Sequence, residues 1–115
     1  MATGVHDHLP LSPATLHVLL ALTGGELHGY GIMLETSRQS GGQYKIGPGT
    51  LYDNLKKLLA AGLVEEAQPE NPKTGERRTF RITSLGVAVL SAETERLTGV
   101  LRHARRSIRL AERRS

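Results

Sequence analysis

Residues Gly47–Leu58 read GPGTLYDNLKKL, and this stretch decides the fold. Pro48 suits the first turn of a helix, because the backbone donor that proline lacks has no partner there. The apolar residues that follow recur at helical spacing and form one stripe: Leu51, Leu55, Leu58 and Leu59. Gly62 predicts the end of the helix at about Ala61. The stretch therefore predicts an amphipathic helix with one buried side and one polar side.

Two more helices are predicted ahead of this one. Ser12, followed by a proline, is a good helix start, and the apolar residues to about position 23 keep helical spacing. A second helix is predicted over 29–40 between glycines, with the ring of Tyr30 packed in the core. Residues 44–46 are predicted to form a short strand.

A hairpin and a long helix are predicted after it. Leu63–Gln68 and Arg77–Thr83 read as strands, and the intervening PENPKTGE is dense in turn residues. Thr83 or Ser84 caps a last helix that runs to about Arg113, and Gly86 and Gly99 within it fit the helix pattern slightly less well. The order predicts a mainly α fold with a small β hairpin, a winged helix-turn-helix followed by a C-terminal dimerisation helix. The predicted parts are a flexible arm (1–11), a DNA-binding domain (12–83) and the dimerisation helix (84–115).

Charge is unevenly distributed along the 115 residues. Residues 1–83 carry eight Lys or Arg and eight Asp or Glu, whereas residues 84–115 carry seven Arg and three Glu, which gives the whole surplus of +4. DNA binding by the first part must therefore rest on local clusters of charge. The chain has no cysteine, no apolar run long enough for a membrane helix and no recognisable secretion signal, so a cytoplasmic location and no membrane partner are expected.

The polar side of the 48–61 helix suits the major groove of double-stranded DNA, which accommodates one helix. The amide of Asn54 is expected to read adenine, and the hydroxyl of Tyr52 either contacts a phosphate or stays exposed while the ring packs on the second helix. Lys57 is either a phosphate contact or a solvated charge. The residues predicted to contact DNA, from this helix, the loop before it and the wing, are Lys45, Pro48, Gly49, Thr50, Tyr52, Asp53, Asn54, Lys57, Lys73, Arg77 and Arg78.

Several stretches resemble the PadR-like family of bacterial transcriptional regulators. They are LHGYGI at 27–32, GPGTLYDNLKKL at 47–58, AGLV at 61–64 and RRTFRITSLG at 77–86. The resemblance spans about residues 14–110. It implies a homodimeric repressor, often responsive to small molecules, whose C-terminal helix makes the dimer. Gly47 and Gly31 depart from the family pattern, where serine and an acidic residue are common, but neither lies on the side predicted to face DNA.

The last helix carries its own apolar stripe, spaced alternately by four and three residues: Leu90, Thr94, Leu97, Leu101, Ala104, Ile108 and Ala111. A helix of this length extends about 45 Å, farther than one small domain can cover. A second copy of the chain is the simplest partner, since two-fold dimers are the commonest oligomers. The residues predicted at the dimer interface are Leu90, Leu97, Leu101, Ala104 and Ile108.

Three other functions compete with DNA regulation. The sequence has no catalytic triad pattern, phosphate-binding loop or HExxH element, so an enzyme is not expected and no cofactor is predicted. His6-Asp7-His8 is a weak metal-binding pattern, and metal-dependent release from DNA would support a metal sensor. A module that binds only proteins is the third alternative, and absence of salt-dependent DNA binding would favour it.

Overall fold

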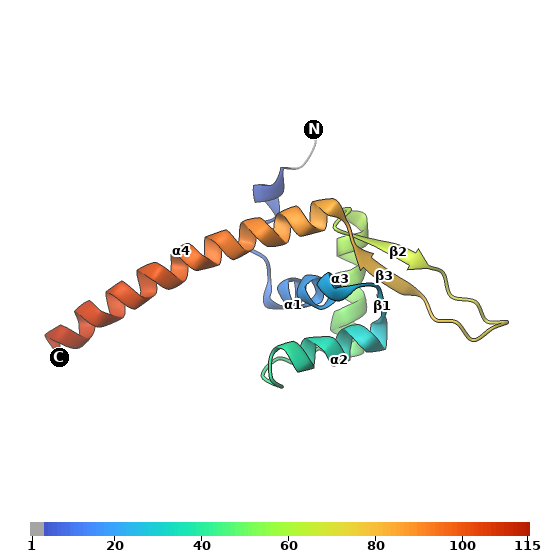
Figure 1. The fold of residues 1–115 in the computed structure, drawn as a ribbon, viewed down its shortest axis with the longest axis horizontal. Coiled ribbons are helices and arrows are strands. Elements are labelled where there is room, and N and C mark those ends of the chain that lie inside the picture. Colours follow the sequence, from blue (N-terminus) through green and yellow to red (C-terminus); the bar gives the residue numbers. More distant parts are fainter. Residues whose placement is uncertain (1–3) are drawn as a thin grey trace.

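The computed structural model describes residues 4–115 and contains a helical domain, a short wing and a projecting helix (Figure 1). The elements in chain order are η1 (Val5–His8), α1 (Pro13–Ala21), η2 (Leu22–Gly24), β1 (Leu27–His28), α2 (Gly29–Gln39), α3 (Pro48–Ala60), β2 (Val64–Gln68), β3 (Thr79–Ile82) and α4 (Ser84–Arg114). The winged helix-turn-helix predicted from the sequence is confirmed. The wing and the far end of α4 extend from opposite sides of the domain.

The small sheet has the order β1-β3-β2, with both pairs antiparallel. The predicted hairpin is present as β2 and β3, but the strand predicted at 44–46 is wrong, because those residues form no ladder. The third strand is β1, whose Leu27 pairs with Phe80 on the free edge of β3. A two-residue strand shows no alternation of its own, so only this distant partner reveals it.

Side chains satisfy the first backbone donors of three helices. Ser12 Oγ accepts a hydrogen bond from the Thr15 amide at 3.2 Å, as predicted for the start of α1. Thr83 caps α4, and its hydroxyl accepts from the amide three residues later at 3.0 Å. At α2 the cap is His28, whose Nδ1 accepts from the Gly31 amide at 3.0 Å. The imidazole therefore has a structural role.

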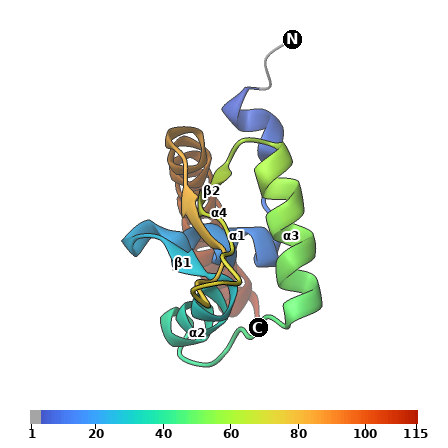
Figure 2. The ribbon, with the colours of Figure 1, turned by 90° about the vertical axis from the view of Figure 1, so that its right-hand side faces the viewer.

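The core lies where α1, α2 and α3 meet the sheet and the start of α4. Figure 2 shows α3 standing along one side of the domain. Three leucines of the stripe predicted for α3, Leu51, Leu55 and Leu58, are buried, and the fourth, Leu59, is partly buried. Buried side chains from the other elements complete the core, among them Leu19, Leu22, Ile32, Leu63, Phe80 and Val89. The burial of this stripe leaves the polar side of α3 facing outward.

The described part of the N-terminal segment, predicted as a flexible arm, packs against the domain. Residues 1–3 of that arm lie outside the described residues. The one-turn helix η1 packs against α4, and the Leu11 amide donates a 2.7 Å hydrogen bond to Oε2 of Glu93. Glu93 is 1% exposed and also pairs with Arg96. The hydrogen bond from Arg96 holds the pKa of the Glu93 carboxyl below its usual value, so the buried group is charged at neutral pH.

The first three turns of α4 belong to the domain. Leu90, predicted at the dimer interface, is only 8% exposed and lies in the core of its own chain. Gly86 is the point of closest approach, because a Cβ there would lie 2.2 Å from the carbonyl oxygen of Leu63. The glycine that weakens the helix pattern is thus what lets α4 dock. Within residues 4–115, no helix is both long and apolar enough to cross a membrane.

Candidate nucleic-acid interface

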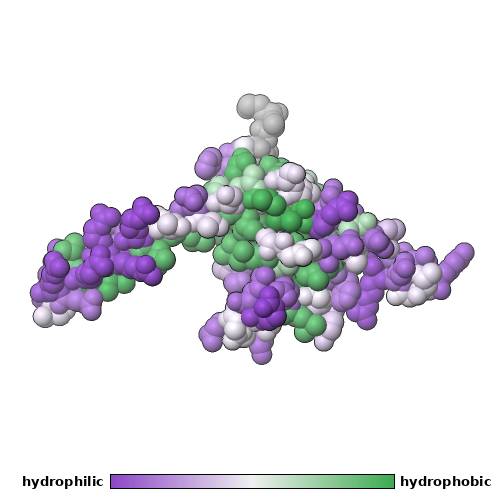
Figure 3. Space-filling view, in the orientation of Figure 1, coloured by the Kyte–Doolittle hydropathy of each residue, from purple (hydrophilic) through white to green (hydrophobic). Residues whose placement is uncertain are grey.

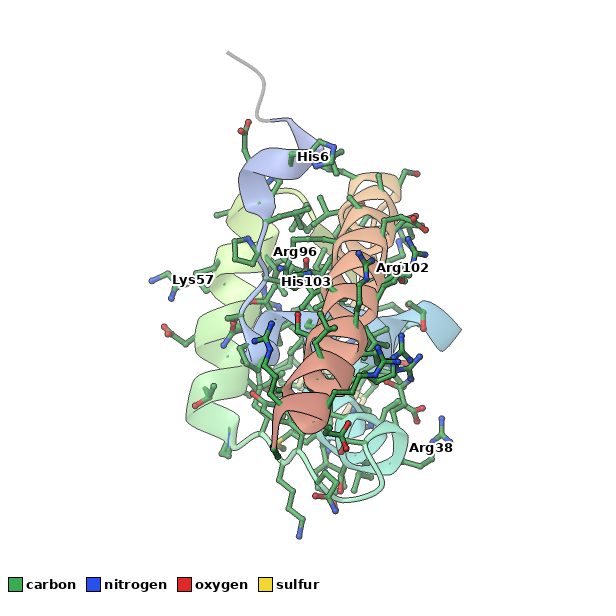
Figure 4. The ribbon with its side chains drawn as sticks, turned by 90° about the vertical axis from the view of Figure 1, so that its left-hand side faces the viewer. His6, Arg38, Lys57, Arg96, Arg102 and His103 are labelled. Atoms are coloured by element: carbon green, nitrogen blue, oxygen red, sulfur yellow. The ribbon has the colours of Figure 1, made fainter. Side chains whose placement is uncertain are left out.

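The outward side of α3 is polar and open. Gly49, Thr50, Asp53 and Lys57 are all exposed, and Lys57 points outward in Figure 4. Lys57 Nζ lies 3.8 Å from Asp53 Oδ2, but both side chains are largely solvated. Such a pair is weak, so the ammonium stays available to a phosphate.

The start of α3 is open as well. Its N-cap is a glycine, so no side chain caps the first turn and no side chain satisfies its first backbone donors. The uncapped donors and the helix dipole favour an anion at this end. Pro48 shapes the turn without a donor of its own. Lys45, which precedes it in the loop, is exposed. Lys45, Pro48, Gly49 and Thr50 are thus all exposed at or just before this end of α3.

Asn54 is held inside the chain. Its Oδ1 accepts a hydrogen bond from the Thr15 hydroxyl at 2.9 Å, and its Nδ2 donates to the carbonyl oxygen of Thr50 at 2.8 Å. Pairing with adenine needs one free amide donor and the carbonyl oxygen. The carbonyl oxygen, however, is engaged by α1. The structure therefore places Asn54 as a link between α3 and α1, and the predicted reading of adenine finds no support in these contacts.

Tyr52 packs on the start of α2, which matches the second of the two interpretations of its ring. A Cβ placed on Gly29 would lie 2.3 Å from the Tyr52 hydroxyl and 2.9 Å from Cζ, so the ring occupies the space that glycine leaves free. The side chain remains 50% exposed. Sequence reasoning missed this role of Gly29, although Gly29 belongs to the LHGYGI stretch that resembles the PadR-like family.

The arginines of the wing differ in availability. Arg78 forms an ion pair with Glu66, and its guanidinium lies 4.9 Å from the centre of the Phe80 ring. These contacts fix Arg78 against the sheet, although it was predicted to contact DNA. Lys73 and Arg77 are exposed and form no ion pair within residues 4–115. They are the wing cations free to meet a phosphate.

A groove of about 550 Å³ separates the start of α2 from the wing. Its lining consists of His28, Gly29, Tyr30, Met33, Pro48, Tyr52, Glu70, Arg77 and Arg78. Tyr30, predicted in the core, is 54% exposed here, so that prediction is wrong. The buried side of α2 is formed by Ile32 and Thr36 instead, and a side chain two positions from Ile32 on a helix points elsewhere.

The far half of α4 exposes apolar side chains that none of residues 4–115 covers. Leu97, Leu101 and Ile108 are 38%, 51% and 58% exposed, and Ala104 is partly buried. Figure 3 shows green surface along this part of the helix between purple charged groups. Arg102 projects to the opposite side of the molecule from Lys57 (Figure 4).

Residues 4–115 contain no cluster of three or more side chains suited to hold a metal ion.

Comparison with known proteins identifies the family. The model of the transcriptional regulator PadR-like family matches residues 18–92. An uncharacterized protein of transposon TN4556 from Streptomyces fradiae is 37% identical over 89 residues, which are 75% of this chain but only 24% of that protein. Transcriptional regulator Rv3488 of Mycobacterium tuberculosis is 35% identical over 88 residues, covering 76% of this chain and 78% of that one.

The solved structures agree on the fold. Bacillus subtilis PadR, determined in complex with operator DNA, superposes with a TM-score of 0.63 at 24% identity, covering 72% of this chain and 47% of that chain. At this identity the likeness speaks for the fold alone. The family consists of transcriptional regulators and not of enzymes. With the family model matching well over half of its length, the chain belongs to the PadR-like family of transcriptional regulators.

Proposed function

We propose that this protein is a repressor that binds operator DNA as a homodimer, with α3 in the major groove and the wing on the backbone. The observation that carries the proposal is the open, polar side of α3 beside the free wing cations Lys73 and Arg77. Exposed polar groups and uncapped helix donors are what bases and phosphates require. The determination of Bacillus subtilis PadR with operator DNA supports the same use of this fold.

Dimerisation through α4 is the second part of the proposal. The helix has 31 residues, so it is about 46 Å long and passes well beyond the domain. Its exposed leucines lie on the heptad stripe, and a second α4 packed along this stripe would cover them. A two-fold dimer presents two copies of α3 to successive major grooves, about 34 Å apart. Release of the dimer by a small-molecule effector, the third part, rests on the family likeness.

Footprinting on the DNA upstream of the protein's own gene tests the regulatory role, because such regulators often repress themselves. Affinities for the protected duplex and for a scrambled duplex are then compared at one salt concentration. A clear preference for the protected duplex is expected. Equal affinities would reject sequence-specific regulation, and no salt-dependent binding to either duplex would favour a protein-binding module.

Sedimentation tests the dimer. The double variant Leu97→Asp with Leu101→Asp places charges on the stripe and is expected to sediment as a monomer with greatly weakened operator binding. Leu110→Asp is the matched control, since Leu110 is 45% exposed on the same helix but lies off the stripe. An unchanged dimer in the double variant would reject α4 as the interface.

A further inference from the structure

The groove between α2 and the wing has the chemistry of an anion site. Two tyrosines, Tyr30 and Tyr52, line it, and both are about half exposed. Neither Tyr30 nor Tyr52 forms a hydrogen bond through its hydroxyl with any of residues 4–115, so both hydroxyls are free to donate. Arg77 adds a cation without an internal partner. The three donors come from α2, α3 and the wing, and all three residues line the same groove.

The start of α2 contributes further donors. His28 Nδ1 accepts from the Gly31 amide, so in the neutral imidazole the proton resides on Nε2, which becomes a donor on a groove-lining side chain. The amides of Gly29 and Tyr30 belong to the first turn, where no intrahelical partner exists. The opposing charge is Glu70, on the wing side of the groove. The groove thus combines several hydrogen-bond donors with one carboxylate that repels anions.

We propose that this groove holds a phosphate of the DNA backbone and that Tyr30, on α2, is a DNA-contacting residue beside α3 and the wing. The inference rests on the proposed function and adds a contact from a helix that was not expected to contribute one. The groove lies on the side of the domain where α3 begins and the wing emerges, so a duplex docked on both passes over it. A phosphate contact carries no base information, so the effect is on affinity for every sequence.

Binding of Tyr30→Phe to the operator and to a scrambled duplex tests the proposal. The lost hydroxyl is expected to weaken both complexes by roughly three- to tenfold, leaving their ratio unchanged. Tyr44→Phe is the matched control, because Tyr44 stacks on His17 at 4.2 Å, outside the groove lining. Glu70→Gln should strengthen binding to both duplexes.

Salt dependence gives an independent readout. Arg77→Gln is expected to lower the salt slope by about one unit, whereas Tyr30→Phe removes no charge and should leave the slope unchanged. If wild type binds the operator but Tyr30→Phe and Tyr30→Ala bind both duplexes as tightly as wild type, the groove holds no phosphate and the proposal is overturned. If wild type binds no DNA, the proposed function itself fails, which is a different result.

Discussion

Replacing Gly29 with alanine separates DNA affinity from stability. The new Cβ would lie 2.3 Å from the Tyr52 hydroxyl, whereas ordinary contacts begin at 3.4 Å, so the hydroxyl must move by 3.4 − 2.3 = 1.1 Å. The obstructing atoms are the far end of a half-exposed side chain, which can swing into solvent. An off-rotamer ring costs about 1 kcal/mol. Alanine also restricts the backbone of the unfolded chain, which returns a similar amount, so the free energy of unfolding should hardly change.

DNA binding is expected to suffer more. In the proposed complex with a phosphate in the groove, the displaced Tyr52 hydroxyl loses a contact worth about 1 kcal/mol, which is roughly a fivefold weaker complex. Fluorescence anisotropy with the operator duplex measures the affinity, and thermal unfolding measures the stability. Gly24→Ala is the control, because a Cβ there meets nothing within 4 Å.

A double-mutant cycle makes the test specific. In a Tyr52→Ala background, Gly29→Ala should cost no further affinity, because the ring it displaces is gone. Equal losses with and without the ring would show that Gly29 acts through something other than Tyr52. Full affinity of Gly29→Ala alone would refute a role in DNA binding for Tyr52 as Gly29 positions it.

Three further predictions concern the contacts that hold the helices in place. Gly86→Ala should lower the free energy of unfolding by about 2 kcal/mol, since its Cβ would meet the Leu63 carbonyl and not a movable side chain; an unchanged melting temperature would contradict this. Glu93→Gln should destabilise the fold at neutral pH. Because Arg96 lowers the folded-state pKa, that loss should shrink as pH falls below about 4.5 and the wild-type carboxylate protonates, as denaturant unfolding at neutral and acid pH would show. Asn54→Ala should cost about 1 kcal/mol of stability and leave the ratio of operator to scrambled binding unchanged; lost discrimination at full stability would restore Asn54 as a base reader.

The periodicity of apolar residues predicted those elements whose buried side chains lie close together in the sequence. The leucine stripe of α3 and the capped start of α4 are visible in consecutive residues, and both are present in the structure. The contact between Leu11 and Glu93 joins positions 82 residues apart, so no local sequence pattern predicts it. For the same reason the sequence did not predict β1, because its two residues form a strand only by pairing with β3.

The site was predicted in outline and not in its contacts. The sequence indicated the exposed polar side of α3, because burial of the leucines leaves the other side outward. It did not reveal that Asn54 is bonded to α1 or that Arg78 is held by Glu66, since both depend on neighbours supplied by the fold. The exposure of Tyr30 was missed because an aromatic side chain is usually buried.

The unbroken course of α4 makes it a lever. One end is fixed in the domain by Gly86 and by the buried Glu93, and no joint interrupts the helix between that anchor and the exposed stripe. The part of α4 beyond Glu93 has 21 residues and is about 30 Å long, so in a dimer built on the stripe a tilt of about 5° between the two helices moves a domain by about 3 Å. That is roughly the rise of one base pair. The angle at which two copies cross therefore sets the spacing of operator half-sites they fit, and a small change in it is enough to lose register with DNA.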